Sequence, residues 1–207
     1  MDWNDRLIII KGARGVGKTT LILQYIKEKF AYNDHALYVS LDDIWFAENR
    51  LVNLADEFVK NGGKYLFIDE VHKYPDWSRE IKNIYDDHPD LHLILTSSSA
   101  LQILKGSADL SRRAVVYSFN EMSLREYIRL HYHIELPELT LDQILNDHIN
   151  RAAEITDSVK PIRVFNEYLK FGSYPYSNEN KHTYLQRLLN TVILTLETDM
   201  PAMVISV

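Results

Sequence analysis

Short runs of apolar residues alternate with longer segments of helical periodicity through the first 120 residues. The runs are typical of buried parallel strands, because strands covered on both faces read as unbroken apolar stretches. The longer segments place apolar residues three and four positions apart, as an amphipathic helix does. The alternation predicts an α/β domain with a parallel sheet. Predicted strands cover residues 6–11, 36–41, 64–70, 91–96 and 114–119, and predicted helices cover 18–30, 48–60 and a segment that follows Pro75.

After the last predicted strand the pattern changes to helices alone. Ser123 and Thr140 each start a capping box, in which a hydroxyl residue is followed three positions later by Glu or Gln. Residues 131–139 between the first two helices read as a linker. The sequence therefore predicts an α/β core over residues 1–120 and a helical subdomain over residues 121–207. Further predicted helices cover 161–171 and 181–197.

A glycine-rich motif lies between the first predicted strand and the first predicted helix. It reads G-x-x-x-x-G-K-T, which in this context is typical of the phosphate-binding loop of nucleotide hydrolases. Glycines let backbone N–H groups turn towards phosphate oxygens, and the helix start adds the positive end of its dipole. Lys18 is predicted to reach the β- and γ-phosphates, and the Thr19 hydroxyl to bind Mg²⁺. The predicted nucleotide-binding residues are Gly12, Ala13, Arg14, Gly15, Val16, Gly17, Lys18, Thr19 and Thr20.

Two carboxylates end the third predicted strand, in a Walker B pattern. Asp69 follows four apolar residues, and Glu70 comes next. A Mg²⁺ site needs a carboxylate at a strand tip beside the phosphate loop, and Asp69 is predicted to fill that role. Glu70 is predicted to polarise the attacking water as a general base. One strand–helix unit separates the loop from these carboxylates, which indicates a P-loop protein with an added central strand and a glutamate base.

Hydroxyl side chains end the fourth predicted strand. Ser97 is predicted to sense the γ-phosphate and help to place the water, with Thr96 and Ser98 as alternatives. The same serine-rich stretch is equally suited to cap a helix before Ala100. Both roles are compatible.

An arginine pair precedes the fifth predicted strand. Arg113, with Arg112 beside it, is predicted to stabilise charge on the transferring phosphoryl group, in its own subunit or in a neighbour. Arg14, inside the glycine-rich loop, is a second candidate for this role. The alternative is a surface arginine pair without a catalytic part.

Composition disfavours several other classes of protein. The 207 residues carry a net charge of −6, which gives no support to non-specific nucleic-acid binding. The chain has no cysteine, and therefore no disulfide framework or thiolate metal site. Neither a signal peptide nor a membrane span is recognisable, so we expect a cytoplasmic protein. The eight histidines show no metal-ligand spacing, and we expect them to be surface or half-buried residues.

Five stretches of the chain together resemble one family, the predicted AAA-superfamily ATPases of bacteria and archaea. They are GARGVGKTTL, YLFIDEVHKYPDW, LHLILTSSSALQIL, SRRAVVYSFNEMSLREY and FGSYP. Members pair an N-terminal ATPase domain with a C-terminal region of unknown function that has a winged helix and a restriction-endonuclease-like domain. The resemblance covers about residues 6–200. It implies a three-layer αβα P-loop fold with a five-stranded parallel sheet in the order 5-1-4-3-2, a helical lid, and ATP with Mg²⁺ as ligands.

The resemblance also implies roles for single residues, and the chain departs from the family pattern at three points. Ser173 replaces the second glycine of a Gly-Gly-x-Pro turn. The phosphate loop begins close to the N-terminus, so we expect the helix that can cover adenine to be missing or short. The family's C-terminal region is absent, so we expect a truncated copy. The residues that match family positions are Lys18 and Thr19 for phosphates and Mg²⁺, Asp69 for Mg²⁺, Glu70 as base, Ser97 or Ser98 as polar strand tip, and Arg113 as the arginine.

The first functional hypothesis is a Mg²⁺-dependent ATPase that acts as a motor or switch for a partner. That partner is an unknown protein, the family's C-terminal region or further copies of the chain. The alternative is a nucleotide-gated binding module with negligible turnover. A GTPase is disfavoured, because N-K-x-D and a D-x-x-G after the third strand are both missing. A small-molecule phosphotransferase would use the same loop, and Glu70 favours water as the acceptor.

Overall fold

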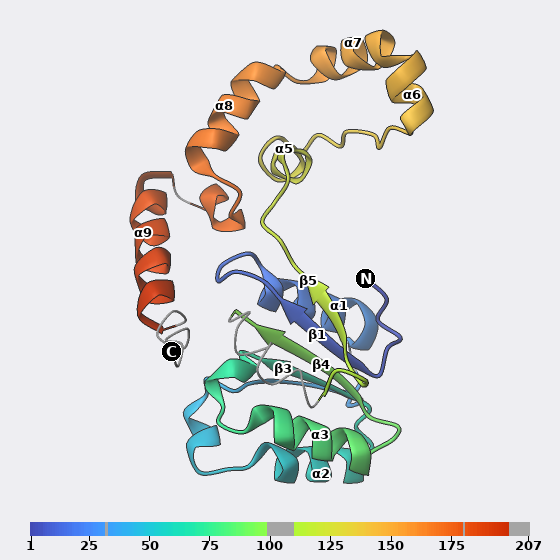
Figure 1. The fold of residues 1–207 in the computed structure, drawn as a ribbon, viewed down its shortest axis with the longest axis vertical. Coiled ribbons are helices and arrows are strands. Elements are labelled where there is room, and N and C mark those ends of the chain that lie inside the picture. Colours follow the sequence, from blue (N-terminus) through green and yellow to red (C-terminus); the bar gives the residue numbers. More distant parts are fainter. Residues whose placement is uncertain (32, 99–109, 180, 199–207) are drawn as a thin grey trace, which may run out of the picture. The chain divides into compact units, whose positions relative to one another are not determined.

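The computed structural model describes residues 1–207 except 32, 99–109, 180 and 199–207. The described residues divide into two compact units (Figure 1). The sheet unit contains Met1–Asn120 and the described end of the last helix, residues 194–198, and the helical unit contains Glu121–Ile193. The helix predicted to begin at Ala100 lies outside the described residues.

Five parallel strands form the centre of the sheet unit. They are β1 (Leu7–Lys11), β2 (Ala36–Ser40), β3 (Tyr65–Asp69), β4 (His92–Ser97) and β5 (Val115–Ser118). Their order is β2-β3-β4-β1-β5, which is the expected order 5-1-4-3-2 read from the other edge. The prediction of the fold class is therefore confirmed.

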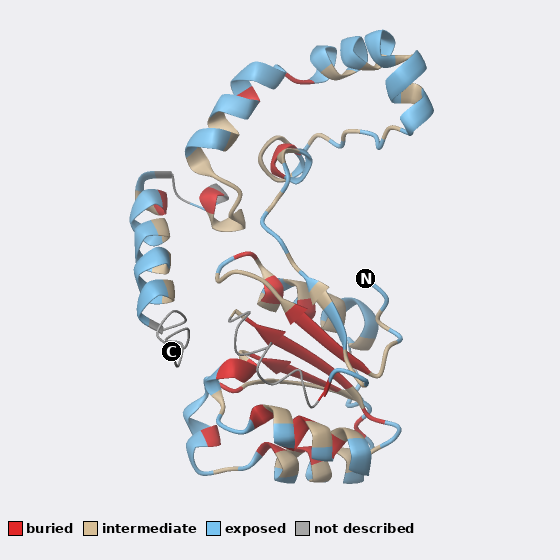
Figure 2. Ribbon diagram, viewed as in Figure 1, coloured by how far each residue is buried: buried red, intermediate tan, exposed pale blue. Residues whose placement is uncertain are grey.

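Helices cover both faces of this sheet, because successive strand residues point to opposite sides. They are α1 (Lys18–Phe30), α2 (Leu51–Lys60) and α3 (Trp77–Asp87). One face buries Ile8, Ile10 and Phe67 beneath α1, and the other packs its apolar residues against α2 and α3. The result is a three-layer α/β/α arrangement whose central strands, β1, β3 and β4, are largely buried (Figure 2).

A short 3₁₀ helix precedes α2 and moves its start from the predicted position. η1 covers Ile44–Ala47, and α2 begins at Leu51 rather than at residue 48. The Asp43 carboxylate accepts a hydrogen bond of 2.8 Å from the Trp45 backbone N–H, which caps the first turn of η1. The predicted helix over 48–60 therefore begins three residues later than expected, and the capped turn of η1 lies before the predicted range.

The helical unit follows the predicted change of pattern after β5. Its small core is made by Tyr127, Ile128, Val159 and Val164. Both capping boxes are present, at Ser123 and Thr140. The elements are α5 (Leu124–Tyr132), α6 (Leu141–Asn146), α7 (His148–Ser158), α8 (Pro161–Phe171), η3 (Pro175–Asn178) and the part of α9 (Lys181–Thr198) up to Ile193.

Two boundaries in the helical unit differ from the prediction. The linker begins at His133 rather than at residue 131, because α5 continues to Tyr132 and His133 then takes a left-handed conformation with φ 56°. The helix that the capping box at Thr140 predicts is interrupted at Asp147. The Asp147 backbone N–H donates to the Gln143 carbonyl at the end of α6, and its carboxylate accepts from Asn150 in α7 at 2.6 Å. An aspartate that serves both helix ends in this way competes with a continuous helix.

Candidate functional site

The glycine-rich loop joins the end of β1 to the start of α1. Gly15 and Gly17 have φ values of 84° and 105°, which favour glycine because a Cβ would be strained there. Gly17 is the N-cap of α1, and it offers no side-chain cap. The first turn of α1 also contains no acidic residue. The first turn of α1 thus supplies neither a side-chain cap nor an acidic residue to its own N–H groups and to the positive end of its dipole.

Gly12 fixes the loop against the neighbouring strands. A Cβ at Gly12 would lie 2.1 Å from the Phe119 carbonyl oxygen, which is backbone and cannot rotate away. The Gly12 N–H donates to the Ser97 carbonyl at 3.3 Å, so the loop is tied to the tip of β4. Close approach of three backbone segments thus explains the glycine at this position.

Two basic side chains of the loop region have buried nitrogen atoms. Lys18 is 4% exposed, and its Nζ donates to the carbonyls of Gly12 and Ala13 at 2.9 Å each. The Nε and Nη2 atoms of Arg14 are buried, and within the described part of the chain they have no hydrogen-bond partner. Buried donors without a partner carry a desolvation cost, which an anion in the loop would relieve.

The Asp69 carboxylate is the centre of a hydrogen-bond network at the tip of β3. The Thr19 hydroxyl donates to its Oδ2 at 2.7 Å, and the Tyr38 hydroxyl donates to the same oxygen at 2.9 Å. Its Oδ1 accepts from the Thr96 hydroxyl and from the Glu70 backbone N–H, the latter at 3.2 Å. Burial, followed by the hydrogen bond to Asp69, raises the pKa of Tyr38, so this hydroxyl remains protonated and donates.

Glu70 has a strained backbone and a more open carboxylate. Its φ of 55° places a non-glycine residue in the left-handed region. Its side chain is 22% exposed, whereas Asp69 is 3% exposed. The Ser98 hydroxyl donates to Glu70 Oε2 at 3.3 Å. Two adjacent carboxylates therefore have different surroundings, one surrounded by donors and one open to a ligand.

His72 is a member of this site that the sequence did not reveal. It lies in η2 (Val71–Lys73), and its side chain is 3% exposed, so the expectation of a surface or half-buried histidine is wrong here. Its Nδ1 lies 3.2 Å from Ser97 Oγ, and its Nε2 lies 3.3 Å from Ser98 Oγ. The only signal in the chain is its position two residues after Glu70. Tyr38 was missed as well, and no local signal distinguishes it from a core tyrosine.

Arg113 lies away from the residues just described. β5 runs parallel to β1, with Ser118 opposite Lys11 at the edge where the loop begins. Arg113 precedes β5, so about 16 Å of strand separates it from that edge at roughly 3.3 Å per residue. There its guanidinium pairs with Asp86 of α3 through two contacts of 3.0 Å. The structure thus brings most predicted site residues together at the carboxyl ends of the strands and leaves Arg113 near their amino ends.

The remaining predicted residues occupy the loop itself. Val16 is buried at 3% exposure, and Thr20 is exposed on the first turn of α1. Their places are consistent with supporting the loop rather than with chemistry.

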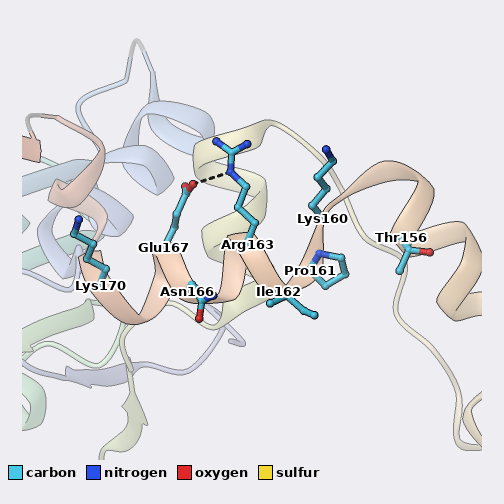
Figure 3. A pocket seen from close by; sticks show the side chains of 8 residues that line it. All are labelled: Thr156, Lys160, Pro161, Ile162, Arg163, Asn166, Glu167 and Lys170. Carbon is cyan, nitrogen blue, oxygen red and sulfur yellow. Dashed lines mark hydrogen bonds and ion pairs between the residues drawn. The ribbon is translucent and has the colours of Figure 1, made fainter.

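A separate pocket lies along α8 in the helical unit (Figure 3). Lys160, Arg163 and Lys170 contribute cations to its wall, and Ile162 contributes an apolar side chain that is 79% exposed. Arg163 is paired with Glu167 at 3.3 Å. The wall lacks the hydroxyl and carboxylate network found around Asp69, so we take the loop region, rather than this pocket, as the candidate site.

No helix among the described residues is both long and apolar enough to cross a lipid bilayer.

Comparisons with known proteins identify the family. An uncharacterized protein, MJ1637, of Methanocaldococcus jannaschii is 30% identical over 206 residues, which cover 92% of this chain and 43% of that protein. The structure of C. elegans PCH-2 is similar with a TM-score of 0.41 and 22% identity, over 66% of this chain and 43% of that one. The chain thus spans less than half the length of either protein. The family AAA_14, described as an AAA domain, matches residues 4–128, more than half of the chain. The protein belongs to this family of AAA domains.

Proposed function

We propose that the sheet unit binds ATP with Mg²⁺ and hydrolyses it, and that the chain uses this cycle as a motor or switch for a partner. Membership of an AAA domain family supports nucleotide binding. The observation that carries the proposal is the 2.7 Å contact of Thr19 Oγ1 with Asp69 Oδ2 beside the glycine-rich loop. A hydroxyl and a carboxylate at that place are the donor set that a Mg–nucleotide complex requires.

The loop supplies the positive groups for a polyphosphate. Lys18 would exchange its two carbonyl partners for phosphate oxygens, which form stronger, charge-assisted hydrogen bonds. Arg14 would gain an anion for its buried nitrogens. The uncapped first turn of α1 adds backbone donors.

Thr19 and Asp69 are the residues that would hold Mg²⁺. Because the Thr19 hydroxyl donates its proton to Asp69, its lone pairs remain for a cation. Across the described residues no group of three histidine, aspartate or glutamate side chains could hold a metal by itself. This fits Mg²⁺, which commonly takes one or two protein ligands and completes its shell with phosphates and water. When bound, the ion would neutralise charge on the phosphate oxygens.

Glu70 is the residue that would accept the proton of water. Asp69 already accepts four hydrogen bonds, whereas Glu70 accepts one from a hydroxyl and keeps part of its surface open. Glu70 is therefore the carboxylate available to take a proton from water, while the donors around Asp69 fix that carboxylate beside Thr19. Ser97 and Ser98, at the tip of β4, would orient the base and the γ-phosphate.

The test is a comparison of ATP binding with ATP turnover in matched variants. We expect Lys18→Ala to abolish binding, while Lys27→Ala on the exposed side of α1 leaves it unchanged. We expect Glu70→Gln to bind ATP normally and to lose turnover by about 100-fold or more, the usual effect of a general base. Glu57→Gln, an exposed change on α2, is the control, and removal of Mg²⁺ with a chelator should stop turnover.

Two results would contradict the proposal. Absence of ATP binding in the wild-type chain would contradict the proposed ligand, and normal turnover in Glu70→Gln would contradict the assignment of Glu70 as the base.

The position of Arg113 supports a second candidate, the nucleotide-gated module with negligible turnover, since this arginine does not complete the site of its own subunit. Tight binding without multiple turnover would favour that candidate.

A further inference from the structure

His72 joins the proposed base to the tip of β4. Its ring lies between the two, with Nδ1 3.2 Å from Ser97 Oγ and Nε2 3.3 Å from Ser98 Oγ. The same Nε2 lies 3.4 Å from Glu70 Oε2. Ser98 Oγ also donates to that carboxylate oxygen, so Glu70, Ser98 and His72 form a closed triangle of contacts.

The chemistry of these groups favours one proton arrangement. A carboxylate can only accept hydrogen bonds, so a proton on His72 Nε2 serves Glu70. Nδ1 of the neutral ring then accepts from the Ser97 hydroxyl. In this arrangement Nε2 donates to Glu70, and Nδ1 accepts from Ser97 of β4.

A histidine in a core needs two polar partners, but they need not be functional groups. Here the contacts of the ring with Ser97, Ser98 and Glu70 are all with residues that the proposed reaction uses. Glu70 has a left-handed backbone, and its side chain is only partly buried, so its direction depends on the groups that touch it. The ring is nearly fully buried and planar, which makes it a rigid support.

We propose that His72 is the positioning residue that holds the Glu70 carboxylate at a fixed place relative to the hydroxyls of Ser97 and Ser98 at the tip of β4. This rests on the proposed function of Glu70 as the base. Through Nε2 the ring fixes the direction of the carboxylate, and through Nδ1 it couples that direction to Ser97. A change at the strand tip thereby reaches the base without moving the backbone of β3.

Three substitutions distinguish the contribution of the Nε2 contact from that of the Nδ1 contact. His72→Phe keeps the ring shape and removes both contacts. His72→Gln places an amide near the position of Nε2, and His72→Asn places one near Nδ1. We expect His72→Phe to lower kcat by about 10- to 100-fold with the Kd of ATP within about twofold, because misplacement of a catalytic group costs rate rather than affinity. His72→Gln should recover most of kcat, and His72→Asn should not.

His88→Phe is the matched control. His88 Nε2 pairs with Asp56 Oδ1 at 2.7 Å, so the variant breaks a histidine–carboxylate pair that is not part of the proposed site. We expect it to lower Tm without changing kcat. A similar loss of Tm in His72→Phe would then not account for its loss of kcat.

A readout without nucleotide tests the contact itself. In chain labelled with ¹⁵N in histidine rings, Glu70→Gln should shift the ring nitrogen resonances of His72, and Glu57→Gln should leave them in place. Unchanged His72 resonances in Glu70→Gln would overturn the inference, as would a kcat for His72→Phe equal to that of the wild type. If the wild type shows no turnover but the His72 resonances still shift in Glu70→Gln, the proposed function fails while the contact between His72 and Glu70 stands, so the two failures are distinct.

Discussion

The helices α2 and α6 have similar apolar spacing in the sequence but are stabilised in different ways. α2 buries Leu51 and Ala55 completely, and its N-cap residue, Arg50, provides no side-chain hydrogen bond. α6 buries none of its residues, and a complete capping box of Thr140 and Gln143 closes its first turn. Periodicity therefore predicts a helix in both places, but it does not predict which force holds the helix.

The same contrast separates the two units as a whole. In the sheet unit the central strands β1, β3 and β4 are buried, whereas α6, α7 and α8 are largely exposed (Figure 2). The helical unit relies more on caps and on tyrosine hydrogen bonds, such as that from Tyr168 to the Met122 carbonyl at 2.8 Å. The proposed chemistry lies in the unit whose geometry is fixed by burial. The exposed apolar side chains of the helical unit include Leu141, Ile144, Leu145, Ile149, Ile162, Phe165 and Leu169.

The same substitution in both helices is the strongest test of this contrast. We expect Leu51→Ala to lower the free energy of unfolding by about 2–5 kcal/mol, because it leaves a cavity between α2 and the sheet. We expect Leu145→Ala, at a side chain that is 64% exposed, to change it by less than about 0.5 kcal/mol. Urea unfolding followed by circular dichroism measures both. A loss of several kcal/mol in Leu145→Ala would mean that this face is covered in solution, and the contrast would disappear.

A smaller effect is expected from the cap of α6. Thr140→Ala removes the hydroxyl that accepts from the Gln143 N–H, and such a cap contributes about 1 kcal/mol. Amide hydrogen exchange along α6 should therefore become about fivefold faster, which is what 1 kcal/mol of local stability corresponds to. Thr156→Ala in α7 is the control, since that hydroxyl bonds back to the Ala153 carbonyl within its own helix. Equal exchange in Thr140→Ala and the wild type would show that packing, rather than the cap, holds α6.

The smallest effect is expected at Arg113. Its pair with Asp86 is partly exposed, at 29% and 44%, so Arg113→Ala should cost less than about 1 kcal/mol of stability. In dilute protein it should leave ATP turnover per subunit unchanged, because the arginine lies at the edge opposite the loop. The rate per subunit over a wide range of protein concentration measures this, with Arg79→Ala as the control.

The dependence of the rate on protein concentration tests whether Arg113 acts at the site of a neighbouring subunit. If the wild-type rate climbs with concentration and the Arg113→Ala rate does not, the arginine completes the site of a neighbour. A loss of turnover in dilute Arg113→Ala would instead place the guanidinium at its own site and contradict the expectation.

Much of the fold could be predicted from the sequence, because its signals are local. Unbroken apolar runs predicted all five strands, and the helix expected over 18–30 is Lys18–Phe30. The capping boxes at Ser123 and Thr140 were recognisable because both partners lie within four residues. The interruption at Asp147 was not predictable from apolar spacing, since the hydrogen bonds of one side chain decide it.

The candidate site was predictable only in part. The residue types and spacing of the loop and of Asp69-Glu70 indicated the nucleotide chemistry. His72 and Tyr38 carried no comparable signal, because each acts through a contact made in space. The register of the strands, with Ile68 beside Leu95, brings the tips of β3 and β4 together and so assembles these contacts.

The sequence by itself determined the elements, their order and the residue types of the loop, because these depend on periodicity and on conformational needs within a few residues. The tertiary structure decided which groups meet. Thr19 Oγ1 and Asp69 Oδ2, from residues fifty positions apart, lie 2.7 Å from each other, whereas Arg113 pairs with Asp86 at the opposite end of the strands. It also decided which apolar faces are buried. The physical reason is that parallel strands align their carboxyl ends, and burial depends on neighbours that distance along the chain does not specify.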